Sequence, residues 1–400
     1  MPEPAERAPV RQRPKPIPLT VVTGFLGAGK TTLLNRLLKD PSLAGTAVIV
    51  NEFGEIGLDH LLVGESEDGI IELSSGCLCC TVRGELVTTL ENLLRARDNH
   101  RIDRLDRVVI ETTGLADPAP VLQSVLLHPY LSLRYRLDGV VTVVDAVNGA
   151  QTLDMSEEAA KQIAVADRIV LTKTDLAGAD PLIVGRIQAL NPGARILDAV
   201  GGEAEPRLLF DTQPFSTEGK IADVAEWLAA EAHDAHGHHH DHHHHEHDHG
   251  HGHHHHPDGH ARHRHTHDVN RHDDRIRSFT ATRTTPIARH ALEDFLERLA
   301  REHGASLLRL KGLVATADAP ESPLVIQAAQ TIFHPPVRLP AWPSADRRSR
   351  LVLIVRDLPE AAENAIIGAF SDLPQSDTAD AATIADNPLA ISGFSGTFKP

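Results

Sequence analysis

The sequence predicts an α/β protein: a parallel sheet with helices on both faces, followed by a smaller α+β domain. Short β-branched apolar segments alternate with helix-compatible segments over about residues 17–232, which is typical of buried parallel strands and their crossover helices. A histidine-rich segment then interrupts the chain, and a different pattern follows it. The expected strands of the first part are 19–22, 47–50, 108–110, 140–144 and 169–171, and its expected helices are 31–39, 85–97 and 219–231.

The part after the histidine-rich segment begins with a strand near 276–282. We expect Thr285 to cap the next helix and Pro286 to open it, with Gly304 at its end. Leu292, Phe295, Leu296 and Leu299 recur at helical spacing and form its apolar stripe. Further strands are expected at 307–310, 324–327 and 351–355, and a last helix at 360–370.

Composition divides the 400 residues into more than one domain. Residues 233–272 hold 21 of the 27 histidines and almost no apolar side chains, so this stretch cannot bury a core. The expected divisions are a flexible N-terminus (1–16), an α/β domain (17–232), a disordered histidine-rich linker (233–274), an α+β domain (275–370) and a loose tail (371–400).

Charge and cysteine content exclude several classes of protein. A formal net charge of −16 argues against general nucleic-acid binding. The three cysteines all lie within 77–80 and cannot form a secreted disulfide framework. Residues 1–18 lack the apolar core of a secretion signal, and no run approaches the roughly 18 apolar residues of a membrane helix. We expect a soluble cytoplasmic protein with no nucleic-acid or membrane partner.

Residues 24–31, GFLGAGKT, match the phosphate-binding pattern G-x-x-x-x-G-K-[ST] between an expected strand and an expected helix. Small residues are needed because backbone N–H groups must surround the phosphates closely. Lys30 is expected beside the β- and γ-phosphates, and Thr31 on Mg²⁺. The other expected nucleotide-binding residues of this segment are Gly24, Gly27, Ala28, Gly29 and Thr32.

A nucleotide hydrolase also needs an acidic group at the end of a neighbouring strand to position Mg²⁺. Residues 108–114, VVIETTG, supply Glu111 at such a strand end. Gly114 is placed to sense the γ-phosphate through its backbone. Lys30, Thr31 and Glu111 are therefore the candidate catalytic residues.

The segment 172–175, TKTD, follows another expected strand and resembles the guanine-recognition pattern N-K-x-D. Asp175 can accept hydrogen bonds from both guanine N–H groups, and Lys173 can lay its methylenes along the base. Thr172 stands where asparagine is usual, so this pattern favours GTP over ATP less strongly than a full match. Asn191 lies either near the base or at a helix end.

Cys77, Cys79 and Cys80 form a compact thiol cluster. Thiolates favour zinc among common divalent metals, with cobalt also open. Glu52, Glu55 and His128 are unranked candidates for the remaining ligands, and a closed zinc clip or a redox pair are alternatives. Residues 51–57, NEFGEIG, follow the second strand, where a nucleotide-dependent switch is expected.

Taken in order, residues 24–32, 51–59, 76–80, 111–118 and 172–175 resemble the CobW-type metallochaperone GTPases. The resemblance extends to about residue 360, because 308–312, LRLKG, is similar to that family's C-terminal domain. It implies GTP hydrolysis coupled to delivery of a metal, with Zn²⁺ as the first expectation, from Cys77, Cys79 and Cys80 to a client metalloenzyme. Cobalt delivery for cobalamin synthesis or nitrile hydratase activation is the alternative within the family.

The histidine-rich segment is expected to hold several weak, exchanging metal sites, because neutral imidazoles bind zinc, nickel and cobalt. It is either a loading antenna or a solvated linker that binds metal incidentally. An alternative function of another class is a histidine-rich metal buffer with a slow GTPase. A transferase with structural zinc and a signalling GTPase fit less well, and the sequence leaves a homodimer open.

Overall fold

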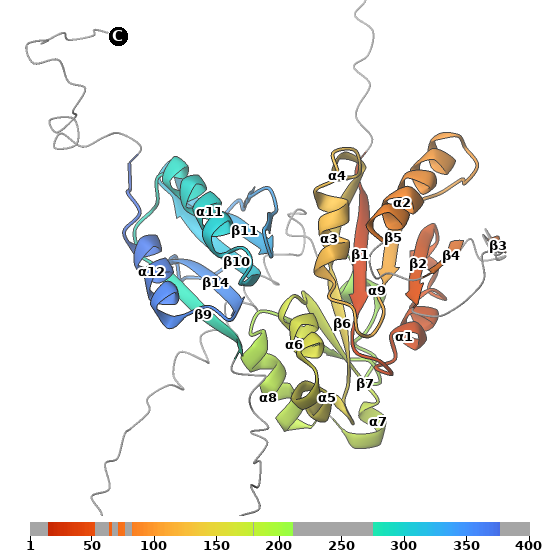
Figure 1. Cartoon of the computed structure of the whole chain (residues 1–400). Coiled ribbons are helices and arrows are strands. Elements are labelled where there is room, and N and C mark those ends of the chain that lie inside the picture. Colours follow the sequence, from red (N-terminus) through yellow and green to blue (C-terminus); the bar gives the residue numbers. More distant parts are fainter. Residues whose placement is uncertain are drawn as a thin grey trace, which may run out of the picture. The chain divides into compact units, whose positions relative to one another are not determined.

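The structure, a computed structural model, describes residues 15–52, 64–65, 71–76, 82–178, 180–210 and 275–376. The chain divides into two compact units (Figure 1): the first holds Met1–Gln213 and Ile221–Arg277, and the second holds Pro214–Lys220 and Ser278–Pro400, so that β9 starts at the boundary between them. The predicted helix at 219–231, the histidine-rich linker and most of the predicted tail lie outside the described residues.

The strands of the first unit are β1 (Ile17–Thr23), β2 (Thr46–Glu52), β3 (Gly64–Glu65), β4 (Ile71–Gly76), β5 (Arg107–Glu111), β6 (Tyr135–Asp145), β7 (Arg168–Thr172) and β8 (Arg195–Asp198). They form one sheet in the order β3-β4-β2-β5-β1-β6-β7-β8. Neighbours pair in parallel, except that β3 pairs antiparallel with β4. The sequence predicted five of these strands; β3, β4 and β8 were not predicted.

Among the described residues, the helices of this unit are α1 (Lys30–Leu37), a 3₁₀ turn (Pro41–Leu43), α2 (Val82–Asp98), α3 (Ala119–Leu126), α4 (Leu131–Arg134), α5 (Gly149–Met155), α6 (Glu157–Ala164), α7 (Thr174–Ala177), α8 (Pro181–Leu190) and α9 (Pro206–Leu209). Side chains alternate between the two faces of each strand. Val22, Val109 and Val170 share one core with α1 and α9, whereas α2, α3 and α4 contact one another and α3 and α4 contact β6. The predicted parallel sheet with helices on both faces is confirmed (Figure 1).

The register of the sheet aligns the carboxyl ends of its strands. Val22 of β1 lies opposite Glu111 of β5, and Glu52 of β2 lies opposite Gly76 of β4. On the other side of β1, Asp145 at the end of β6 lies opposite Thr172 at the end of β7. Ligands of open α/β sheets bind at this edge, so the segments that follow these strands define the candidate site.

The second unit contains β9 (Ile276–Arg283), α11 (Arg289–His303), β10 (Leu307–Thr316), β11 (Ala319–Ala329), β12 (Ile332–Phe333), β13 (Val337–Arg338), β14 (Ser349–Arg356) and α12 (Glu360–Ser371). Its sheet has the order β12-β11-β10-β14-β9, and β13 also pairs with β11. Strand β10 runs antiparallel to both β11 and β14. The core lies between this sheet and the two helices, where the rings of Phe295 and Phe370 lie 5.7 Å apart. The predicted α+β domain is confirmed.

The predicted start of α11 was wrong. The helix begins at Arg289 after Ala288, not at Pro286. Ile287 keeps the chain extended because its N–H and carbonyl bond Ala315 and Ala317 at 2.9 Å. Thr285 does not cap the helix, and its hydroxyl instead accepts a hydrogen bond from Arg283 Nε at 2.7 Å. The predicted apolar stripe and the end at Gly304 are confirmed.

None of the helices in the described part of the chain is both long and apolar enough to cross a membrane.

Candidate functional site

The loop between β1 and α1 closes around its own glycines. Gly24, Gly27 and Gly29 have φ angles of 139°, 73° and 93°, which L side chains rarely adopt. A Cβ on Gly24 would lie 2.2 Å from the carbonyl oxygen of Val143. Only glycine therefore fits at this position. The first N–H groups of α1 follow directly, and no side chain caps them, so they are placed to receive an anion.

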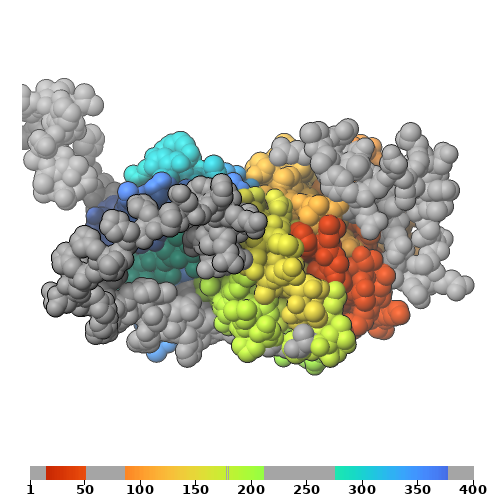
Figure 2. All heavy atoms as spheres, turned by 60° about the horizontal axis from the view of Figure 1, so that its bottom comes forward, coloured from red at the N-terminus to blue at the C-terminus, as the bar shows by residue number. Residues whose placement is uncertain are grey.

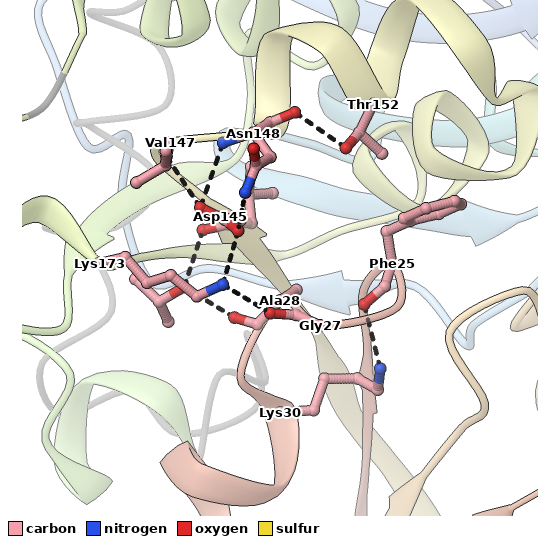
Figure 3. Close-up of polar contacts among 11 residues, drawn as sticks. Phe25, Gly27, Ala28, Lys30, Asp145, Val147, Asn148, Thr152 and Lys173 are labelled. Atoms are coloured by element: carbon pink, nitrogen blue, oxygen red, sulfur yellow. Dashed lines mark hydrogen bonds and ion pairs between the residues drawn. The ribbon is translucent and has the colours of Figure 1, made fainter. Parts of the chain in front are cut away.

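Lys30 lies across this loop. Its Nζ donates to the carbonyl oxygen of Gly24 at 3.0 Å. It also donates to the carbonyl oxygen of Phe25 at 3.3 Å (Figure 3). The side chain is buried against the loop, so its ammonium is held where phosphates would lie.

Thr31 and Glu111 meet at the same end of the sheet. Thr31 Oγ1 donates to Glu111 Oε1 at 2.7 Å, although the two residues come from α1 and from the end of β5. The next residue, Thr112, ties β5 to β1 by a bond of 2.8 Å between its hydroxyl and that of Thr23. A hydroxyl and a carboxylate are hard oxygen donors of the kind Mg²⁺ takes beside phosphates. This donor set fits Mg²⁺.

Gly114 contacts the phosphate-binding loop through its backbone. A Cβ at this position would lie 2.5 Å from the backbone nitrogen of Leu26. Its carbonyl oxygen accepts a hydrogen bond from Gln162 Nε2 at 3.2 Å. Sequence reasoning did not find Gln162, because only the tertiary structure brings α6 to this loop.

The last residue of β7 and the residue that follows it also contact the phosphate-binding loop. Thr172 Oγ1 donates to the carbonyl oxygen of Ala28 at 2.7 Å. Lys173 has a φ of 60°, and its Nζ donates to the carbonyl oxygen of Gly27 at 2.9 Å. Thr172, in the place where asparagine was expected, therefore still anchors this segment to the loop.

Lys173 also pairs with Asp145, a residue that sequence reasoning missed. The distance from Lys173 Nζ to Asp145 Oδ2 is 2.6 Å, and the same carboxylate accepts bonds from Val147 N and Asn148 Nδ2 at 2.8 and 2.9 Å (Figure 3). Burial raises the pKa of Asp145, but the bonds from Lys173 and Asn148 outweigh it and hold that pKa below its usual range. Asp145 is therefore a charged anchor for Lys173.

Asp175 is exposed on the first turn of α7. Its neighbour Thr174 donates to Asp198 Oδ1 at 2.7 Å, which joins α7 to the end of β8. Burial raises the pKa of Asp198, but bonds from Thr174 and from the backbone N–H groups of Gly201 and Val200 outweigh it and lower the pKa.

A pocket of about 330 Å³ lies beside the phosphate-binding loop. Phe25–Ala28, the end of β6, α5, α6 and Lys173 line it. In the space-filling view, the red atoms of residues 15–52 border the yellow atoms of the segment that follows β6 (Figure 2). The phosphate-binding loop is therefore bounded on this side by helices as well as by the sheet.

The structure does not describe the side chains of the predicted cysteine and glutamate metal ligands. Cys77, Cys79, Cys80 and Glu55 lie outside the described residues, and Glu52 is described only as backbone in β2. Among the described residues, no group of three or more His, Cys, Asp or Glu side chains could hold a metal ion. His128 instead accepts a hydrogen bond from Leu131 N at 3.3 Å.

Asn191 has a structural role. Its Nδ2 donates to the carbonyl oxygens of Ile163, Ala164 and Ala166 at 2.8, 3.2 and 2.9 Å. It therefore secures the end of α6. Asn191 is also the residue that ends α8, so of the two predicted alternatives the helix end is the one observed.

The glycine-lined loop, Lys30 and the Thr31–Glu111 pair at the carboxyl edge of a parallel sheet define a P-loop nucleotide-binding protein. The family model for the CobW/HypB/UreG nucleotide-binding domain matches residues 18–198. The model for the cobalamin synthesis protein cobW C-terminal domain matches residues 276–371. The chain belongs to the CobW family.

Relatives agree with this assignment. "Zinc chaperone CobW" of Sinorhizobium sp is 33% identical over 394 residues, which cover 88% of this chain and 97% of the relative. "Zinc chaperone YjiA" of Escherichia coli (strain K12) is 42% identical over 206 residues, 52% of this chain and 64% of that protein. The crystal structure of Zn(II)-bound YjiA GTPase from E. coli matches with a TM-score of 0.62 and 30% identity, covering 90% of this chain and 99% of that one.

Proposed function

We propose that this protein is a GTPase that binds zinc at Cys77, Cys79 and Cys80 and delivers it to a client metalloenzyme in the cytoplasm. The observation that carries the proposal is the strand order β4-β2-β5-β1. Strand β4 ends at Gly76, one residue before Cys77, and lies two strands from Glu111. Adjacent strands are about 4.8 Å apart, so β4, whose last residue Gly76 precedes Cys77, lies about 10 Å from β5.

Guanine is the proposed base because Asp175 follows Lys173 at the spacing of the guanine-recognition pattern. A carboxylate accepts from both the ring N–H and the exocyclic amine of guanine, and adenine cannot satisfy it in this way. The bonds of Thr172 and Lys173 to Ala28 and Gly27 support the proposal, because they fix this segment relative to the phosphate-binding loop.

Thr31 and Glu111 are the proposed holders of Mg²⁺. When bound, Mg²⁺ neutralises charge that develops on the phosphate oxygens. Lys30 adds a second positive charge on the same side, and Gly114 is proposed to donate its backbone N–H to the γ-phosphate. The water-excluding surroundings of Glu111, which is 5% exposed, strengthen these interactions.

Zinc is the proposed cargo because thiolates bind it strongly and the matched relatives carry the name zinc chaperone. Glu52 and Glu55, from the segment after β2, are the proposed additional ligands. Cobalt is the alternative cargo. Hydrolysis can drive release only when the GTP and GDP states bind the metal with different affinity.

The test is a zinc titration of the full chain loaded with a non-hydrolysable GTP analogue or with GDP. We expect one tight site that is at least tenfold tighter in the analogue state and is lost in Cys79→Ser. Ser75→Ala, a change in the preceding strand that removes no thiol, is the matched control. Equal affinity in the two nucleotide states would contradict metal delivery driven by GTP.

A further inference from the structure

Gln162 is almost completely buried, with 1% of its surface exposed. It lies on α6 among small apolar residues, and its Nε2 donates to two carbonyl oxygens of the loop after β5: Gly114 at 3.2 Å and Ala116 at 3.0 Å. Both N–H groups of one carboxamide are thus directed to the loop that begins at Glu111.

Helix α6, which carries Gln162, is itself held in place by hydrogen bonds. Thr142 of β6 donates its hydroxyl to the carbonyl oxygen of Gln162 at 2.6 Å, and Ser156 caps the start of α6. On its other side the loop is in backbone contact with Leu26, where a Cβ on Gly114 would lie at 2.5 Å. Gly114 is therefore held between the phosphate-binding loop and α6.

The orientation of the Gln162 side chain leaves its carboxamide oxygen without a hydrogen bond. Gln162 Oε1 is buried and has no hydrogen-bond partner within the part of the chain that the structure describes. A buried acceptor left unsatisfied is destabilising, and an apolar residue of the same size would avoid it. Packing alone does not explain a glutamine here, whereas the two bonds to the loop do.

We propose that Gln162 is a positioning residue that holds Gly114 in place for the γ-phosphate and so sets the preference of the protein for GTP over GDP. The proposal rests on the proposed role of Gly114. GDP has no γ-phosphate, so its affinity does not depend on where the Gly114 N–H points. Removing the carboxamide therefore weakens the binding of GTP and not that of GDP. Without it, the loop that carries Gly114 must be ordered when GTP binds.

Gln162→Met is the variant that tests this. Methionine has a similar length and removes both the two N–H donors and the unsatisfied acceptor. The stability lost with the two hydrogen bonds is therefore partly offset by removal of the buried, unsatisfied oxygen. Tyr135→Phe is the matched control. It also removes a buried donor to a backbone carbonyl, the 2.9 Å bond to Leu90, but Tyr135 pairs with Ile17 at the opposite edge of the same sheet.

The measurement is the dissociation constant of a non-hydrolysable GTP analogue and of GDP, in Mg²⁺ without transition metal, together with kcat and KM. For Gln162→Met we expect about tenfold weaker binding of the analogue, GDP affinity within twofold of wild type and a lower kcat. Tyr135→Phe is expected to keep the wild-type ratio.

An unchanged ratio, or an equal loss for both nucleotides, would overturn the role of Gln162 while leaving the proposed function standing. Failure of the wild-type protein to bind guanine nucleotides would overturn both. These measurements contain no zinc. The ratio of the two nucleotide affinities therefore does not depend on whether zinc binding is coupled to the nucleotide state.

Discussion

Thr31 Oγ1 and Glu111 Oε1 are joined by a 2.7 Å hydrogen bond between α1 and the end of β5. This bond lies at the carboxyl edge of the sheet, where Val22 of β1 and Val50 of β2 both lie opposite Glu111 of β5. The bond places a hydroxyl and a carboxylate, both hard oxygen donors, side by side at this edge of the sheet.

Glu111→Gln is expected to lower GTP turnover about 100-fold, because the amide keeps the shape of the side chain but loses the charge that positions Mg²⁺. Phosphate release measures turnover, and the concentration of Mg²⁺ for half-maximal activity is expected to rise. Glu91→Gln is the control, because Glu91 pairs with Arg95 on the surface of α2 at 3.4 Å. A Glu111→Gln protein with wild-type turnover would remove Glu111 from the site.

Gly24→Ala is expected to abolish binding of GTP and GDP alike. Its Cβ would meet the Val143 carbonyl at 2.2 Å, at a φ of 139°, and we expect a stability loss of about 2 kcal/mol. Gly185→Ala is the control, since nothing lies within 4 Å of its added Cβ and it sits inside α8. That change is expected to raise stability by about 0.5–1 kcal/mol. Thermal unfolding and nucleotide titration measure both variants.

Asp145→Asn is expected to lower both thermal stability at neutral pH and guanine-nucleotide affinity, because Lys173 loses its charged partner. The folded-state pKa of Asp145 lies below its ordinary value of 3.8. The carboxylate therefore contributes its stabilisation fully above that ordinary value, and the contribution is lost as the pH falls through the folded-state pKa. The difference in melting temperature between wild type and Asp145→Asn should shrink below about pH 4; a constant difference would argue against the ion pair as its cause.

Deletion of residues 233–272 is expected to remove the weak zinc sites and to keep the tight, thiolate-dependent site and GTP turnover. The segment holds 21 histidines, whose imidazoles bind zinc in many geometries. Competition with chelators of graded affinity separates the two classes of site. Loss of the tight site on deletion would favour the metal-buffer alternative.

The phosphate-binding loop could be predicted from sequence because its pattern is local. Eight consecutive residues specify both the glycines that permit the φ angles and the lysine that follows them. Glu111 and the segment 172–175 were also predictable, since each directly follows an apolar strand. The start of α11 was not, because the bonds of Ile287 to β10 override the local capping signal of Thr285 and Pro286.

The sequence by itself determined the class of fold, the phosphate-binding loop and the concentration of thiols and imidazoles in two segments, because these depend on residues close together in the chain. Only the tertiary structure decided which side chains support that loop. Asp145 reaches Lys173 across 28 positions, and Gln162 reaches Gly114 across 48. No local pattern encodes such pairs, because the order of strands and helices in space brings them together.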